Sequence, residues 1–149
     1  MKYLKYIAIA LLMVTSTNIE AKKIKVPHVY MFGFSASFQD STIYITDIQD
    51  VHDAWMDTKS KFLLGRDSYS YQLKNYLTDQ QQPNRVCMVF FATKKAKAEK
   101  QYAKVLKKYT NVKNKKRKKT HNSTTPSTYD IKYITPQEFK FETVDMSDE

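Results

Sequence analysis

Alternating apolar and polar positions near the start of the chain predict two neighbouring β-strands. Within residues 28–38, large aromatic side chains recur at every second position, Tyr30, Phe32 and Phe34 among them, while the positions between are mostly smaller or more polar. A period of two is typical of a strand, and we expect this one to be buried mainly on its aromatic side. Residues 42–47 alternate again after a short turn, so the two runs predict an antiparallel hairpin.

The segment after the hairpin shows no clear period until a helix begins. Residues 48–66 contain scattered large apolar side chains, and we interpret them as a loop with a short helical turn. Asp67 or Ser68 is suited to cap a helix that runs to about Thr78, because a short polar side chain accepts hydrogen bonds from the free N–H groups of the first turn. Tyr69 begins an apolar stripe at helical spacing along this segment.

The second half of the chain predicts a further strand, a long helix and two shorter strands. Residues 85–92 are apolar on both faces, which is typical of a central strand covered on each side. Thr93 is suited to cap a helix that runs to about Thr110 and carries an apolar stripe. Residues 129–134 alternate as a last main strand, and residues 139–141 predict a short edge strand.

This order of elements, β-β-α-β-α-β, predicts an α/β fold, with α+β as the alternative class. We expect one small domain over residues 22–145, in which a mixed sheet has helices packed on it. Residues 111–128 are polar, strongly basic and then rich in Ser and Thr, so we interpret them as a mobile basic loop within this domain. Residues 146–149 form an acidic tail.

Residues 1–21 have the layout of a secretory signal peptide. Lys2 and Lys5 precede an unbroken apolar run over residues 7–14, and a polar stretch then ends in a small residue at Ala21. The apolar run is far shorter than the about 20 residues that a membrane-spanning helix needs. We therefore expect export and cleavage, no transmembrane segment in the mature chain, and a soluble protein that is periplasmic or secreted.

The scarcity of cysteine and glycine excludes several kinds of site. Cys87 is the only cysteine, which excludes an internal disulfide and a zinc site built from several thiolates. Its apolar neighbours indicate a buried core residue rather than a nucleophile, since burial raises the pKa of a thiol. With Gly33 and Gly65 as the only glycines, the chain has no glycine-rich phosphate-binding loop. The sequence therefore predicts no catalytic residue and no cofactor, and it favours a binding domain over an enzyme.

Charge is concentrated in one part of the chain. Residues 94–119 hold thirteen basic side chains and one acidic one, whereas residues 22–93 have a net charge of +1 and residues 120–149 a net charge of −4. Such a basic segment attracts polyanions without reading a base sequence, because lysine is a point charge that lacks the planar fork of arginine. The candidate contacts lie on the predicted helix and in the loop that follows it: Lys97, Lys100, Lys104, Lys107, Lys108, Lys115, Lys116, Arg117, Lys118 and Lys119.

A second candidate site is a cluster of acidic and histidine residues within residues 47–57. Carboxylate and imidazole groups crowded at the end of a strand can hold a metal ion or act in general acid–base chemistry, and the residues assigned to a metal are Asp50, His52 and Asp53. The spacing matches no calcium-binding loop. The alternative interpretation is that these residues form turns and caps where the strand ends.

The N-terminal region resembles a group of exported proteins. Residues 22–38, Lys-Lys-Ile-Lys-Val-Pro-His-Val-Tyr-Met-Phe-Gly-Phe-Ser-Ala-Ser-Phe, together with the signal segment before them, resemble small exported proteins of unknown function from Bacteroidota-type bacteria. The resemblance extends through residues 62–67 and 71–76 to the strand at 85–92. It implies an envelope or secreted location, and it implies no catalytic residue, cofactor or substrate.

Three hypotheses follow from the sequence. The leading one is a non-enzymatic cell-envelope domain whose lysine-rich helix and loop contact an anionic polymer, a lipid surface or an envelope protein. The first alternative is a small metal-dependent hydrolase that uses the Asp/His cluster at 47–57. The second alternative is a secreted effector that binds host nucleic acid or membrane.

Overall fold

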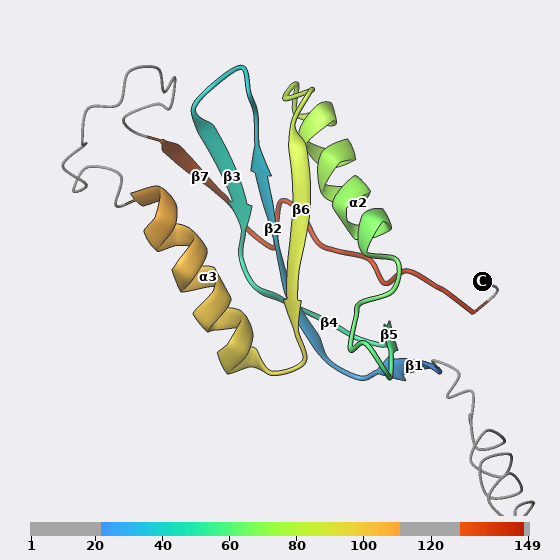
Figure 1. The fold of residues 1–149 in the computed structure, drawn as a ribbon. Helices are drawn as coiled ribbons and strands as arrows, with labels where there is room; N and C mark the ends of the chain where they lie inside the picture. The colour runs from blue at the N-terminus through green and yellow to red at the C-terminus, as the bar shows by residue number, and fades with distance from the viewer. Residues whose placement is uncertain (1–21, 111–128, 148–149) are drawn as a thin grey trace, which may run out of the picture.

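The computed structural model describes residues 22–110 and 129–147; the predicted signal peptide, the predicted loop at 111–128 and the last two residues lie outside these ranges. The described chain has an α/β fold in which two helices pack on a mixed sheet (Figure 1). The strands are β1 (Lys23–Val26), β2 (Val29–Ala36), β3 (Thr42–Thr46), β4 (Gln49–Val51), β5 (Ala54–Asp57), β6 (Val86–Ala92) and β7 (Asp130–Ile134), and the helices are α2 (Arg66–Asp79) and α3 (Lys95–Thr110).

Strand β2 is the centre of the main sheet. It pairs antiparallel with β6 along one edge, from Tyr30 opposite Ala92 to Ala36 opposite Val86. Its other edge is shared by two antiparallel partners, β4 alongside the first half of β2 and β3 alongside the second half. Strand β7 lies parallel to β3 on the far side. A separate two-stranded antiparallel sheet consists of β1 and β5.

The predicted central position of residues 85–92 is therefore wrong, although both helices contact β6, as expected of a strand covered on each side. Among the described strands β6 pairs only with β2, and its side chains Val86 and Met88 remain 49% and 37% exposed. Strand β2 occupies the central position instead. It is buried on both faces, not mainly on the aromatic one, since Met31 and Ser35 on the opposite face are each 0% exposed.

The two helices cover opposite faces of β2. The Tyr102 ring of α3 meets the Phe32 ring edge to face, with centroids 5.0 Å apart. The next residue along the strand, Gly33, faces Leu73 of α2. Because successive residues of a strand point to opposite faces, β2 lies between α3 on one side and α2 on the other, as the arrangement of the ribbons in Figure 1 shows.

Two segments differ from the prediction, and in both the elements concerned are too short for a repeat of two to identify them. Residues 48–66, predicted to be a loop, contain β4 and β5, which are only three and four residues long. Residues 139–141, predicted to be an edge strand, form none. The Gln49 side chain binds them in place of a strand partner: its Nε2 donates to the Phe139 carbonyl and its Oε1 accepts from the Phe141 N–H, each at 2.9 Å.

Helix α2 begins without a side-chain cap. Gly65 occupies the N-cap position with a left-handed φ of 66°, a conformation that glycine adopts without steric cost. The predicted capping role of Asp67 or Ser68 is therefore wrong, since the helix already begins at Arg66. The predicted apolar stripe is confirmed, and Tyr69 is 0% exposed.

Candidate functional site

Two histidines and a carboxylate meet at the end of the β2–β4 pairing. The register places Val29 opposite Val51, so His28 and His52 are the next residues along the same alignment. Side chains alternate between the two faces along a strand, and residues opposite or diagonal to one another across a strand pair are close neighbours. The side chains of His28, Asp50 and His52 are therefore brought to one face by the backbone pairing itself.

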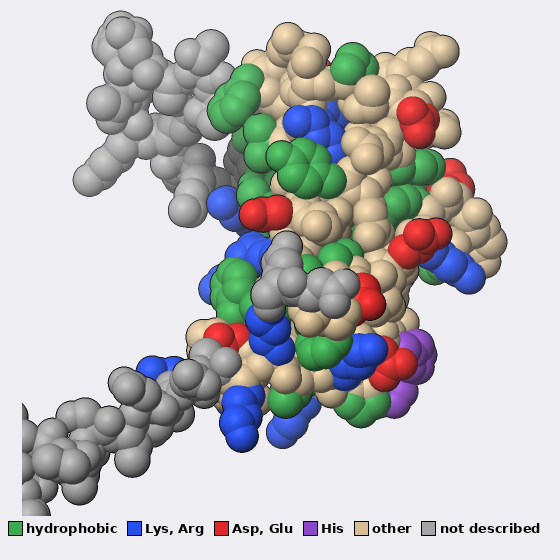
Figure 2. All heavy atoms as spheres, turned by 90° about the vertical axis from the view of Figure 1, so that its right-hand side faces the viewer, with side chains coloured by type: hydrophobic (Ala, Val, Ile, Leu, Met, Phe, Trp, Pro, Cys, Tyr) green, Lys and Arg blue, Asp and Glu red, His purple; other side chains and the backbone are tan. Residues whose placement is uncertain are grey.

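The contacts within this group, which we call the His–Asp–His cluster (His28, Asp50 and His52), are close. His28 Nδ1 lies 2.9 Å from Asp50 Oδ2, and His52 Nε2 lies 3.8 Å from the same oxygen. The two imidazole rings meet edge to face with centroids 4.8 Å apart. Figure 2 shows the two histidines (purple) side by side at the surface, next to acidic side chains (red). The three side chains are 51%, 35% and 63% exposed, so an ion from solvent can reach them.

The other carboxylates of the predicted cluster have separate places. Asp53 lies in the turn between β4 and β5 with a φ of 55° and is not among the three residues whose ligand atoms converge. Asp57 accepts hydrogen bonds from the Lys59 and Ser60 N–H groups at 2.7 and 2.8 Å. These bonds, that from Ser60 above all, lower the pKa of the Asp57 carboxyl. Asp57 therefore acts as a turn residue, as the alternative interpretation of the cluster expects.

The metal hypothesis from the sequence names Asp50, His52 and Asp53 but not His28. One signal was present: Asp50 and His52 are separated by one residue, so in a strand they share a face. The partner across the pairing was not visible, because β4 is only three residues long and no pattern in it predicts its register with β2.

Helix α3 presents its lysines to solvent on the side opposite its apolar residues. Lys97, Lys100, Lys104, Lys107 and Lys108 are all exposed, and their spacing of three, four, three and one residues returns them to one face of the helix. We call these five residues the lysine stripe. Within the described residues, no acidic side chain lies within ion-pair distance of the lysine stripe.

The opposite side of α3 holds the helix on the sheet. Ala98 is fully buried, and Tyr102, Val105, Leu106 and Tyr109 are partly buried. This division leaves the lysine stripe on the solvent side of α3, away from the packing of the helix on the sheet. The other predicted polyanion contacts, Lys115, Lys116, Arg117, Lys118 and Lys119, lie outside the described residues.

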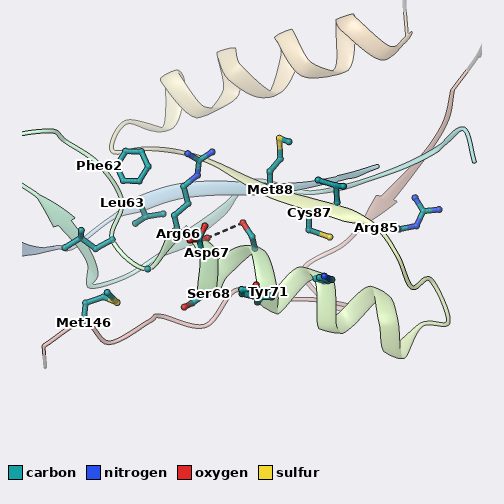
Figure 3. A pocket seen from close by; sticks show the side chains of 15 residues that line it. Phe62, Leu63, Arg66, Asp67, Ser68, Tyr71, Arg85, Cys87, Met88 and Met146 are labelled. Carbon is teal, nitrogen blue, oxygen red and sulfur yellow. Dashed lines mark hydrogen bonds between the residues drawn. The ribbon is translucent and has the colours of Figure 1, made fainter. Parts of the chain in front are cut away.

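Cys87 is half-buried rather than fully buried, and it lines a groove of about 1030 Å³ between the outer edge of β6 and α2. Figure 3 shows Cys87, Met88, Tyr71 and Arg66 around this groove. The Cys87 thiol donates to Ser35 Oγ at 3.4 Å, and burial raises its pKa. No histidine lines the groove, so neither described histidine is placed there as a base for a thiolate nucleophile.

Comparisons of the chain with protein-family models, curated proteins and solved structures found no significant match. Neither described helix combines the length and the apolar character that crossing a lipid bilayer requires.

Proposed function

We propose that this chain is an exported, non-enzymatic binding domain that contacts an anionic polymer through the lysine stripe of α3 and the basic residues that follow it. The observation that carries the proposal is the position of the stripe: five lysines on one exposed face of a helix whose other face packs on the sheet. Glu99, the one acidic residue of α3, is two residues from Lys97 and one from Lys100, and it therefore projects from a different side of the helix.

The dimensions of the lysine stripe favour a linear polyanion. From Lys97 to Lys108 the helix rises about 16 Å, at roughly 1.5 Å per residue. Along this length the positive charges follow the helix axis, and a chain of phosphate, sulfate or carboxylate groups can lie beside them. Neutralising such a chain releases its condensed counterions, so the binding free energy depends strongly on salt. Lysine supplies charge without a fixed donor geometry, so we expect little selectivity among polyanions of equal charge density.

Export is the second part of the proposal. Its support is the order of a basic start, an apolar run over residues 7–14 and a small residue at Ala21. Mass spectrometry of the protein isolated from its cells should find an N-terminus within two residues of Lys22. An intact Met1 terminus on cytosolic protein would contradict export. The proposed polyanion surface does not depend on export and is tested separately.

The polyanion surface is tested with the mature chain, residues 22–149, on three immobilised partners: duplex DNA, an acidic polysaccharide and vesicles of an anionic phospholipid. We expect retention on the two polymers at about 50 mM salt and release at a few hundred millimolar. Retention on vesicles alone would indicate that the partner is a lipid surface rather than an anionic polymer. Absence of retention on all three would leave the lysine stripe as a solvated surface, and a partner protein would have to be sought.

A further inference from the structure

We propose that His28, Asp50 and His52 form a binding site for a divalent late first-row transition ion of the Zn²⁺ or Cu²⁺ kind. This inference concerns another part of the molecule from the lysine stripe and does not depend on it. The chain has only three histidines, and two of them converge on one carboxylate. Nδ1 or Nε2 of each imidazole and an oxygen of the carboxylate all lie within 4.8 Å of one another.

The distances are close to those of a bound ion. In a tetrahedral zinc site with metal–ligand distances of about 2.0–2.1 Å, neighbouring ligand atoms are roughly 3.4 Å apart. The observed separations from Asp50 Oδ2, 2.9 Å to His28 Nδ1 and 3.8 Å to His52 Nε2, lie on either side of that value. The remaining adjustment needs only side-chain rotation, since His28 and His52 are both more than half exposed.

The backbone that carries the three ligands is already fixed. His28 directly precedes β2, and Asp50 lies in β4, which pairs with β2. The turn at His52 is tied to the C-terminal segment, because Thr143 Oγ1 donates to the His52 carbonyl at 2.8 Å. The Tyr30 ring is parallel to that of His28, with centroids 6.4 Å apart. A site built on paired strands loses little backbone freedom when an ion binds, which favours affinity.

The ligand set selects the class of ion. Ca²⁺ and Mg²⁺ take oxygen ligands almost exclusively, so two imidazoles and a single carboxylate disfavour them. Imidazole nitrogen suits Zn²⁺, Cu²⁺ and Ni²⁺, and the affinity of such a site is highest for Cu²⁺ in the usual series. Three protein ligands also leave at least one coordination position for water or for a donor atom from a partner.

The direct His28–Asp50 contact by itself does not explain the cluster. An ion pair between exposed side chains contributes little to stability, and the packing of this pairing comes from Val29 and Val51, which are 0% and 4% exposed. The fold therefore depends little on these three side chains, and they are free to bind an ion.

The test uses the tag-free mature chain and isothermal titration with ZnCl₂ at neutral pH, with CaCl₂ as the comparison ion. We expect one Zn²⁺ per chain and no heat from Ca²⁺. His28→Ala, His52→Ala and Asp50→Asn should each weaken Zn²⁺ binding by about tenfold or more, the size seen even for residues that only support metal ligands. Asp53→Asn is the matched control, because it removes a neighbouring charge in the same turn and should leave the affinity within about twofold.

Cu²⁺ loaded at one equivalent gives a second readout, since electron paramagnetic resonance detects coupling to the two imidazole nitrogens, and this signature should be lost in the double variant His28→Ala/His52→Ala. All four positions are exposed, so circular dichroism should show every variant folded. The proposal is overturned if no Zn²⁺ binding is detected at a protein concentration on the order of 100 µM. It is also overturned if His28→Ala binds like wild type, or if replacing the third histidine of the chain, His121, by Ala alone abolishes binding.

Discussion

Gly33 and Leu73 lie so close together that a larger residue at position 33 requires the Leu73 side chain to move. A Cβ built on Gly33 would lie 2.6 Å from Leu73 Cδ2 and 3.2 Å from Phe141 Cζ. Leu73 is itself 0% exposed and belongs to the hydrophobic core, so a movement of its side chain disturbs the packing around it. This contact sets the distance between α2 and the central strand of the sheet.

Replacing Gly33 with Ala should therefore destabilise the fold. Overpacking a closed core costs about 1–3 kcal/mol, and chemical denaturation should show a loss of that size. The control is the double variant Gly33→Ala/Leu73→Ala. Removing the Leu73 methyl groups opens room for the new Cβ, so the cost of Gly33→Ala should be smaller in the Leu73→Ala background than in wild type. Equal costs in both backgrounds would show that the Gly33–Leu73 contact does not fix this distance.

The Cys87 thiol should react slowly in the native protein. Burial raises its pKa, the hydrogen bond to Ser35 partly opposes this, and the thiolate is the reactive form. A thiol reagent at mildly alkaline pH should label the folded chain much more slowly than the unfolded chain, and Cys87→Ala should cost about 1 kcal/mol of stability. Fast labelling of native protein would mean that the groove beside β6 exposes a reactive thiolate.

Alkaline pH should weaken the packing of α3 on the sheet. Burial, with smaller contributions from the charges of Asp47 and Tyr133, raises the pKa of Tyr102 to about 12. In the unfolded chain a tyrosine titrates near pH 10. The folded state thus holds the Tyr102 proton more tightly, and the stability linked to it is present below pH 10 and lost as the pH rises from 10 to 12.

Thermal unfolding measured across this range tests the Tyr102 prediction, with Tyr102→Phe as the comparison. The phenylalanine variant keeps the ring against Phe32 and removes the ionisable group, so its stability should fall less steeply between pH 10 and 12. Identical pH profiles for the two proteins would place the alkaline loss elsewhere.

Most of the fold could be predicted from periodicity, and its centre could not. Both helices and the main strands appear within a few residues of where the patterns place them. The centre was misassigned because residues 85–92 are apolar on both faces, while Gly33 and Ser35 make one face of β2 look polar. Gly33 occupies that face because α2 approaches closely, and the Ser35 hydroxyl accepts from Cys87. Neither contact can be inferred from the hydrophobic periodicity of the sequence.

The two candidate sites also differ in how far the sequence predicts them. The lysine stripe is a local feature of one helix, and its spacing is visible in the sequence. The His–Asp–His cluster joins residues 22 to 24 positions apart through the pairing of β2 with a three-residue strand. Such a pairing is set by tertiary structure, so the sequence could offer Asp50 and His52 as candidates and could not supply His28.

The most direct test of the proposed function compares two variants of equal charge. In one, the lysine stripe is replaced by Gln, which preserves helix propensity. In the other, five exposed lysines away from α3 are replaced in the same way: Lys22, Lys23, Lys59, Lys74 and Lys140. Because the two variants lose the same net charge, any difference between them reports on position alone.

The measurement is the slope of log affinity for duplex DNA against log salt concentration. We expect the lysine-stripe variant to lose about 4 to 5 units of that slope if all five lysines contact phosphates, while the control variant keeps a slope close to that of wild type. Equal slopes in the two variants would contradict a localised polyanion surface on α3 and would assign the attraction to net charge alone.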